Sequence, residues 1–364
     1  MKIVTKNFKG DKLYNIKNDN GELLFSEYQF YICQVGDFFI IDHNCYYNVI
    51  NIEGKDAFTN SDTLTYWKQA FAFANKYIIV EYPYTNIRKY ENMNILSLDG
   101  AKMLEKNIDY ITPTENGKYA LINEVNRECF FSVYSNVLNN KLEKIFNFDA
   151  KSISYISEKD LFNVQTESGW QLYNNKGELV FPKNGYSKQR ITYIEENETY
   201  IFTNEKEKNI IYDNNFQPIC NGLCFDNLCT CFRNGFYTVE YNGKWNYIDI
   251  DGNFLIKDNT LNIVHANAFH NGYGIIYIQK IESPYKLAYD GSSYENIYAK
   301  LVDSEGNFVV KSNEFTDFRT FKGCVESEYF IGCKRCDSGY GFTQLVYLKG
   351  SEELYSQDLS IVNK

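Results

Sequence analysis

The chain has 364 residues, of which 44% are hydrophobic and 23% charged, and this balance excludes a mainly disordered protein. Its 37 Lys and Arg residues against 47 Asp and Glu residues give a net charge of −10, which disfavours a nucleic-acid partner. Aromatic residues reach 17%, with 32 Tyr and 27 Phe, while only 5 residues are Pro. Because aromatic side chains favour strands, the composition predicts an all-β fold.

The first residues and the apolar runs bear on where the protein works. Residues 1–10 are interrupted by Lys and Asn, so they do not resemble a secretory signal. The longest apolar runs, such as residues 38–41, are far shorter than a membrane span. We therefore expect a cytoplasmic protein with no membrane partner, or a virion-associated one, because the Asn-rich and Lys-rich composition is typical of a low-GC bacterium or its phage.

The most regular part of the chain is the segment 232–256. It reads as three strands separated by a turn at Asn242-Gly243 and a second turn at Asp251-Gly252. Asn and Gly tolerate the positive φ that tight hairpin loops require, and the flanking residues are aromatic or β-branched. The segment therefore predicts an antiparallel meander.

The same pattern recurs along the chain. In chain order its copies lie at residues 13–25 (around Gly21), 46–58 (Gly54), 95–104 (Gly100), 119–130 (Val125-Asn126), 170–181 (Gly177), 210–220 (Asn214-Asn215), 297–310 (Gly306) and 340–355 (Gly350). About nine units at a mean spacing of about 41 residues fall in the range typical of repeat arrays. We expect one β-repeat domain over residues 1–364, built from three- to four-stranded meanders.

The spacing widens at residues 60–90, 130–165 and 280–296, where we expect inserted loops. Within the first of these, Leu64, Trp67 and Phe71 predict one or two helical turns over residues 63–75. Extra loops of repeat proteins often gather on one face and form the binding surface.

The segment 242–256, NGKWNYIDIDGNFLI, resembles the bacterial WG (KWG) β-repeat family, whose units read aromatic, Gly, aromatic, Ile-Asp, then Gly. The Gly after the aromatic residue is replaced by Asn246 after Trp245 and by Gln171 after Trp170. The resemblance implies an interaction scaffold and supplies no catalytic residues. The segment is also similar to the choline-type cell-wall-binding repeats, but these are shorter and rich in Trp, whereas this chain has 3 Trp.

Cysteines are the first candidates for chemistry. Cys220, Cys224, Cys229 and Cys231 could supply four thiolates to zinc, but their spacing matches no paired zinc knuckle. Cys229 and Cys231 would lie on one face of a strand, where free Cys behaves as a small core residue. Cys333 and Cys336 have the C-x2-C form of a redox motif without its helix context.

The remaining motifs favour structural interpretations. The three histidines are His43, His265 and His270, and none stands in a metalloprotease motif. Asp249, Asp251 and Asn253 imitate the start of a calcium loop, yet an Asp-Gly turn explains them. Gly272 and Gly274 lack the third glycine and the helix of a phosphate loop.

The sequence therefore predicts tandem meanders closed into a propeller-like ring, with an open superhelical array as the alternative. We assign no catalytic, cofactor-binding or metal residues and expect a non-enzymatic scaffold that binds a protein partner through inter-repeat loops. The alternative is a glycan or small-ligand binder that uses exposed aromatics, for which Trp67 and Trp170 are the probes.

Overall fold

The computed structural model describes residues 2–43, 46–57, 67–82, 93–106, 108–123, 134–270, 272–279, 297–309, 315, 317–320, 329–335, 342–349 and 352–358. The regular elements in these ranges are β-strands and three short 3₁₀ helices. No helix in the described part of the chain is long and apolar enough to cross a membrane. The all-β expectation is confirmed.

The chain forms two compact units, Met1–Gly185 and Tyr186–Lys364. The sheets of the first unit are β1 (Lys2–Phe8) and β2 (Asp11–Lys17); β3 (Ile32–Val35), β4 (Phe38–His43) and β5 (Tyr46–Asn51); β6 (Gln69–Phe73), β7 (Tyr77–Glu81) and β8 (Met93–Ser97); β9 (Tyr110–Pro113), β10 (Ala120–Asn123) and β11 (Asn136–Leu138); and β12 (Ser152–Ile156), β13 (Leu161–Gln165), β14 (Trp170–Tyr173) and β15 (Leu179–Phe181), with η1 (Ser157–Lys159) between β12 and β13.

The second unit continues the series. Its sheets are β16 (Thr192–Ile194), β17 (Thr199–Thr203) and β18 (Asn209–Tyr212); β19 (Asn227–Arg233), β20 (Phe236–Tyr241) and β21 (Lys244–Ile248); β22 (Ile263–Ala266), β23 (Tyr273–Gln279) and β24 (Ile297–Asp303); and β25 (Asp317–Thr320), β26 (Tyr329–Arg335), β27 (Phe342–Lys349) and β28 (Glu352–Asp358). The short helices η2 (Glu195–Asn197) and η3 (Cys220–Gly222) lie between strands.

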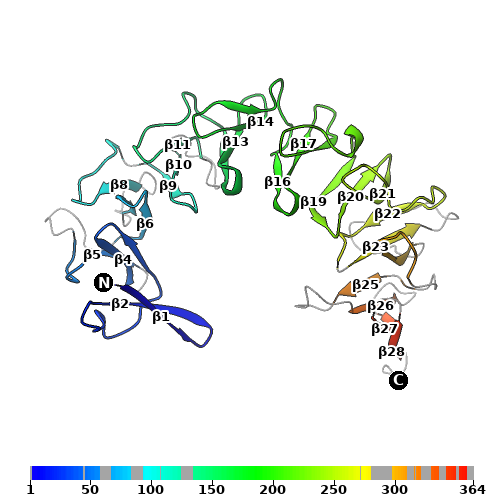
Figure 1. Cartoon of the computed structure of the whole chain (residues 1–364), viewed down its shortest axis with the longest axis horizontal. Coiled ribbons are helices and arrows are strands. Elements are labelled where there is room, and N and C mark those ends of the chain that lie inside the picture. The colour runs from blue at the N-terminus through cyan, green and yellow to red at the C-terminus, as the bar shows by residue number, and fades with distance from the viewer. Residues whose placement is uncertain are drawn as a thin grey trace. The chain divides into compact units, whose positions relative to one another are not determined.

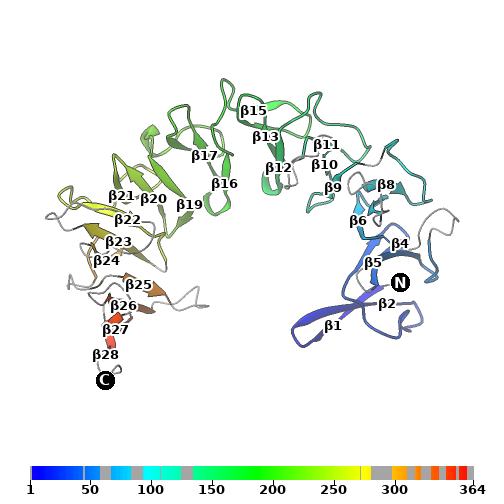
Figure 2. The same cartoon turned by 180° about the vertical axis from the view of Figure 1, so that it is seen from behind.

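Each sheet is an antiparallel meander of strands that are consecutive in the sequence. Figures 1 and 2 show from opposite sides that, within each unit, the sheets follow one another in chain order. Tandem meanders are therefore confirmed. The single nine-unit domain and its closure into a ring stay predictions.

The cores lie between successive sheets. One cluster joins Val35 and Ile40 of the second sheet to Ala70 and Ile78 of the third. In the second unit, Tyr247 of β21 packs with Ile276 of β23 in the same way. A sheet of three short strands cannot bury both faces alone, so within each unit neighbouring meanders stabilise one another.

In the most regular copy, segment 232–256, the strands that make up the meander differ from the predicted ones. Its meander begins one strand earlier, at β19, and the expected third strand around Phe254 is reduced to a single bridge with Ile248. Both predicted turns are present. Asn242 and Gly243 both have positive φ, at 53° and 74°, as a tight hairpin loop requires.

A partly buried asparagine, Asn246, joins the strand β21 to the segment after the next turn. The Asn246 side chain donates from Nδ2 to the carbonyl of Ile256 (2.8 Å), and its Oδ1 accepts from the backbone N–H groups of Tyr247 (2.8 Å) and Ile256 (3.1 Å). This one amide ties β21 to the chain that returns after the turn. The equivalent side chains that make the same bonds to a residue ten positions later are Asn15, Asn94 and Asn136.

The turn that follows this asparagine, which we name the repeat turn, also recurs. In the best copy Asp249 accepts the backbone N–H of Asn253, and Gly252 has φ 90°. The left-handed residues that hold this position in chain order are Gly21, Gly54, Gly100, Leu142, Gly177, Phe216, Gly252 and Gly306. In each case its N–H donates to the carbonyl of the residue three positions earlier.

Several of these glycines also touch the preceding repeat. A Cβ at Gly177 would lie 2.5 Å from the carbonyl oxygen of Ile145, and one at Gly306 would lie 2.7 Å from that of Leu255. Positive φ and close approach therefore both favour glycine here. The contact fixes how successive meanders meet.

Three expectations for the first unit are wrong. The fourth repeat turn lies around Leu142, whereas Val125-Asn126 is outside the described residues. Residues 134–165 are consequently no insertion but ordinary strands, β11 to β13. The described part of the expected 63–75 helix contains the strand β6, whose Phe71 pairs with Ile79 across the sheet. The described part of the expected 60–90 insertion, residues 67–82, holds the regular strands β6 and β7, while residues 280–296 and the turn at Gly350 lie outside the described ranges.

Candidate ligand-binding surfaces

The larger groove that we describe lies beside the most regular repeat and has a volume of about 750 Å³. One wall comes from the β20–β21 hairpin, another from the repeat turn at Gly252, and the third from the segment that leads toward β22. The same sequence feature that defines the repeat therefore also shapes this groove.

Aromatic side chains form the apolar part of the groove. Tyr241 and Phe254 pack with ring centroids 5.5 Å apart, and Trp245 packs edge-on against His265 at 5.1 Å. Trp245 is only partly buried and lines the groove. Burial lowers the pKa of His265, which keeps the ring beside Trp245 neutral near neutral pH.

The rim of the groove is polar. Lys244 donates from Nζ to the carbonyl of Asn259 at 2.8 Å. Asp258 accepts from the hydroxyl and the backbone N–H of Thr260, and these bonds hold the pKa of the Asp258 carboxyl below its usual value. The groove therefore combines an aromatic wall with lysine, carboxylate and amide groups at its edge.

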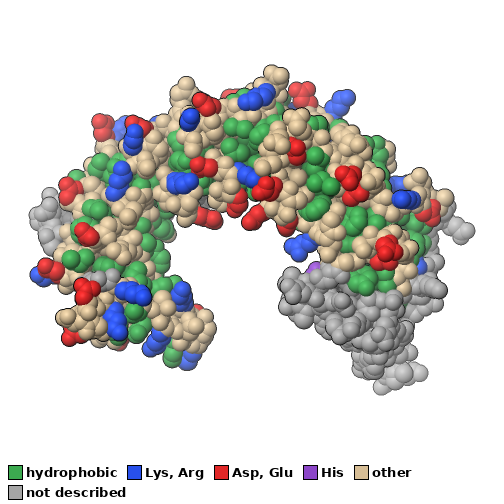
Figure 3. All heavy atoms as spheres, in the orientation of Figure 1, with side chains coloured by type: hydrophobic (Ala, Val, Ile, Leu, Met, Phe, Trp, Pro, Cys, Tyr) green, Lys and Arg blue, Asp and Glu red, His purple; other side chains and the backbone are tan. Residues whose placement is uncertain are grey.

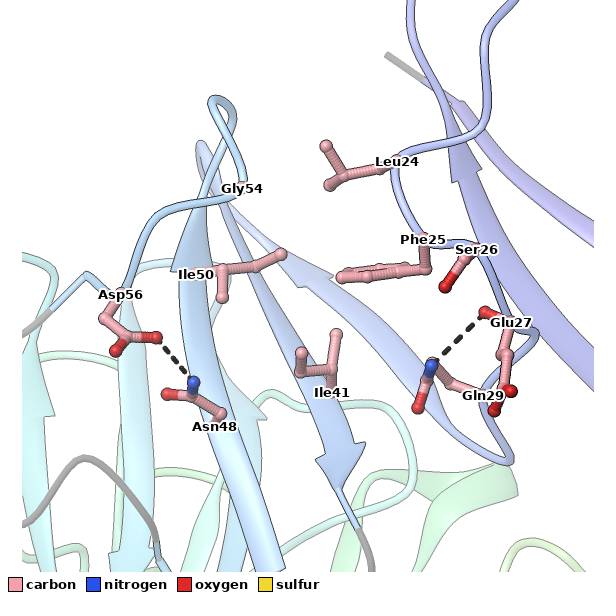
Figure 4. A pocket seen from close by; sticks show the side chains of 10 residues that line it. All are labelled: Leu24, Phe25, Ser26, Glu27, Gln29, Ile41, Asn48, Ile50, Gly54 and Asp56. Atoms are coloured by element: carbon pink, nitrogen blue, oxygen red, sulfur yellow. Dashed lines mark hydrogen bonds between the residues drawn. The ribbon is translucent and has the colours of Figure 1, made fainter.

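A second, smaller pocket of about 460 Å³ lies in the first unit (Figure 4). Phe25 projects between Ile41 of β4 and Ile50 of β5, so the segment after β2 forms one wall and the next meander the other. Asn48 donates to Asp56 across the opposite side, at 2.6 Å. Glu27 and Asp56 give this pocket an acidic rim.

Exposed apolar side chains recur on the repeat turns. Ile52 and Ile250 lie four residues after the aligned polar residue of their repeats, Asn48 and Asn246, and are 49% and 45% exposed. Leu23 and Phe308 share a second position, eight residues after it, and Met103 lies at the next position of its own turn. Figure 3 shows apolar side chains interspersed with charges of both signs on the visible face. The turns therefore present apolar groups to solvent at related positions.

The four clustered cysteines do not converge. The thiol of Cys220 is buried and donates to the carbonyl of Asp249 at 3.3 Å, whereas Cys224 is exposed. Cys229 and Cys231 lie on β19 with their sulfurs 3.1 Å apart and are only partly buried, so the shared face is confirmed and full burial is not. Within the described residues, no three His, Cys, Asp or Glu side chains are grouped as a metal site requires.

The other predicted positions have structural roles. Asp249 caps the repeat turn, as the Asp-Gly interpretation requires. Gly274 lies against the ring of Tyr247, where a Cβ would come within 2.5 Å, so packing explains it. The His265 ring packs against Trp245 and Tyr277, whereas the buried Nε2 of His270 has no hydrogen-bond partner among the described residues. The side chain of His43 and all of Cys336 lie outside the described residues.

Of the two tryptophans predicted as surface probes, Trp67 is buried, so the prediction is wrong for this residue. It is 1% exposed and packs edge-on against Tyr82 at 5.1 Å, within the core between the second and third sheets. Trp170 on β14 is partly exposed. Trp245, which lines the larger groove, is not among the predicted probes, although its place between two hairpin turns of the most regular repeat is a signal for it.

No protein-family model and no curated protein matches the chain. Among solved structures, it is similar to a structure of the eukaryotic initiation factor, with 10% identity, 98% of this chain and 95% of that chain covered, and a TM-score of 0.39. It is also similar to apo AztD from Citrobacter koseri (13%, 80% and 89%, TM-score 0.30) and to the C-terminal WD40 domain of Sif2 (10%, 90% and 79%, TM-score 0.25).

Proposed function

We propose that the protein is a non-enzymatic scaffold, a divergent relative of the WG-repeat proteins, that binds a protein partner through its repeat turns. The observation that carries this proposal is the recurrence of exposed apolar residues on the turns, with Ile52 and Ile250 at one equivalent position. Single exposed apolar residues need no explanation, but their recurrence at equivalent positions of the repeat turns, in both units, supports a role of these turns in partner binding.

Affinity capture from the native source tests the scaffold. We expect wild-type protein to retain one stoichiometric partner and the variant Leu23→Lys/Ile52→Lys/Met103→Lys to lose it, because buried lysines in an apolar interface are unfavourable. The matched control is Phe8→Lys/Tyr110→Lys, which changes exposed side chains outside the turns. Loss with the control but not with the turn variant, or turnover of a substrate abolished by one substitution in a loop, contradicts the proposal.

The groove beside Trp245 favours a second candidate, a glycan-binding function, because sugar rings stack on partly exposed indoles. We expect any glycan-array signal of the protein to be lost in Trp245→Ala and kept in Trp170→Ala. Both tryptophans lie on strands and are partly buried, so the control has a similar effect on packing. An array without signal, or a signal equally sensitive to both substitutions, excludes this candidate.

A further inference from the structure

The strand β19 carries a bulge at its cysteines. Leu228 pairs with Val239 and Phe232 pairs with Tyr237, so three residues of β19 lie opposite one residue of β20. The three residues are Cys229, Thr230 and Cys231. A bulge bends its strand and releases the inserted residues from regular pairing.

This bend brings the two sulfurs together. In a regular strand, residues two apart have Cα atoms about 6.6 Å apart, near the upper limit for a disulfide. Here the Sγ atoms of Cys229 and Cys231 are already 3.1 Å apart. Forming a disulfide of about 2.0 Å would require the sulfurs to approach by only about 1 Å. Two zinc ligands would instead be about 3.8 Å apart, from a Zn–S bond of about 2.3 Å and tetrahedral angles.

The surroundings leave the pair reachable and under electrostatic control. Both cysteines are partly exposed, and β19 is the first strand of its sheet. Burial and the neighbouring Cys229 thiol raise the pKa of Cys231, while Arg233 opposes this rise and Glu196 of η2 adds to it. Because the thiolate is the nucleophile, exchange at this pair should accelerate as pH increases.

We propose that Cys229 and Cys231 form a reversible dithiol–disulfide site that exchanges with low-molecular-mass disulfides such as oxidised glutathione. One thiolate attacks a sulfur of glutathione disulfide, forms a mixed disulfide and releases one glutathione thiolate. The second cysteine, as its thiolate, then attacks the protein sulfur of the mixed disulfide and releases the second glutathione. The protein loses two protons and two electrons, and the glutathione disulfide is reduced to two glutathione molecules.

The disulfide would close a small ring across Thr230 and fix the bulge. The strand β19 lies against η2 and β16 of the preceding sheet. Oxidation would therefore stiffen the edge at which the first two sheets of the second unit meet. We expect amide hydrogen exchange at residues 228–232 to be slower in the oxidised protein.

Equilibration of the intact protein in glutathione redox buffers tests the site. Trapping free thiols with iodoacetamide, cleaving with trypsin and sequencing the peptide 209–233 by tandem mass spectrometry reports all four of its cysteines at once. We expect Cys229 and Cys231 to lose alkylation together, with a peptide lighter by two hydrogens and no fragment between the two positions. Cys224, exposed in the same peptide, should remain alkylated under the same conditions.

Variants separate the two steps. Cys229→Ser and Cys231→Ser should each stop at a single stable glutathione adduct, and Cys224→Ser should behave as wild type. Circular dichroism melting curves show whether each variant keeps its fold, and the wild-type peptide provides the result without any substitution. Persistent glutathione adducts on the wild type, independent alkylation of Cys229 and Cys231 at every redox ratio, or pairing of either with Cys224 would overturn the proposal.

Discussion

The repeat turn and the first hairpin of a meander both contact a neighbouring repeat, but they do so in different ways. The repeat turn keeps one geometry, and its left-handed residue is glycine at six positions and Leu142 or Phe216 at the other two. The first hairpins vary: β3 and β4 are joined through Gly36, whereas η1 and the left-handed Asp160 join β12 to β13. The repeat turn, which approaches the preceding repeat through its backbone, keeps one conformation. The first hairpin, which makes its contacts through side chains, differs in sequence and conformation from repeat to repeat.

Side chains of the hairpin tips form the second line of contacts between repeats. Gly36 donates its N–H to the Asn75 side chain at 3.0 Å, one repeat further along the chain. Asp160 accepts from Tyr155 at 2.6 Å and from Tyr119 of the preceding sheet at 3.2 Å. One such bond recurs: the side chain of Asn116 donates to the hydroxyl of Tyr155, and that of Asn197 donates to the hydroxyl of Tyr237 one repeat further along the chain.

The largest effect should come from filling the close approach at a repeat turn. We expect Gly177→Val to lower the free energy of unfolding by about 3 kcal/mol or more, because it combines positive φ with a clash against the Ile145 carbonyl. The control Gly243→Val also has positive φ but open space around it, so it should lose about 1 to 2 kcal/mol. Equal losses of unfolding free energy for the two variants, measured by urea denaturation, would contradict a packing role of Gly177.

At Gly252 the same reasoning predicts a loss of more than about 1 kcal/mol for Gly252→Val. A Cβ there would lie 2.9 Å from the backbone carbon of Cys220 in the preceding repeat. An unchanged melting temperature would contradict the repeat turn in this unit.

Removing a buried turn asparagine should have the next largest effect. Asn136→Ala leaves the backbone groups of Val137 and Phe146 without their side-chain partner, and we expect a loss of about 2 kcal/mol. Asn140→Ala, at an exposed position of the same repeat, should change stability by less than about 0.5 kcal/mol. Thermal unfolding of the two variants shows whether the side-chain amide of Asn136 itself contributes to stability. Equal melting temperatures of the two variants would contradict this role.

A hairpin tip should respond to pH. Burial alone would raise the pKa of Asp160, but hydrogen bonds from Tyr155, Asn175 and Tyr119 lower it below its unfolded value. Its stabilisation is therefore present above about pH 4 and lost as pH falls through the lower folded pKa. Asp160→Asn should cost about 1 kcal/mol at pH 7 and reduce the slope of stability at acid pH. Parallel stability-versus-pH curves for both proteins would contradict this role.

The smallest expected effect is stabilising. Glu207 is exposed with φ 59° in the β17–β18 connection, where Asn204 accepts two backbone N–H groups as in the repeat turn. Glu207→Gly relieves left-handed strain but adds chain entropy to the unfolded state, so we expect a gain of about 0.5 kcal/mol. A loss of similar size in chemical denaturation would show that the side chain contributes contacts of its own.

These contrasts explain what could be predicted from the sequence. Glycine predicts several repeat turns because it adopts positive φ with the least strain of any residue, as at Gly21, Gly54, Gly177 and Gly252. Leu142 gives no such signal: it adopts the same conformation while packing on the core of the preceding repeat, so tertiary packing outweighs local preference. The sequence pattern therefore misses the repeat turn at Leu142.

The candidate surfaces were less accessible to prediction. Burial of Trp67 depends on its packing between two sheets, which no local pattern contains. The exposure of Trp245 and the 3.1 Å approach of Cys229 to Cys231 likewise follow from a groove and a bulge that form only when strands pair. Strand content is therefore local information, whereas the sites depend on how the strands pair and pack.

The close approach of Gly177 to Ile145, and that of Gly306 to Leu255, each couple one meander to its neighbour within a unit. Under a stretching force, load would pass through these contacts in series, so meanders should detach one at a time while their neighbours stay folded. A single-molecule force–extension trace would then show a sawtooth whose peaks repeat at nearly constant contour length, and the protein would behave as an extensible tether that absorbs mechanical work.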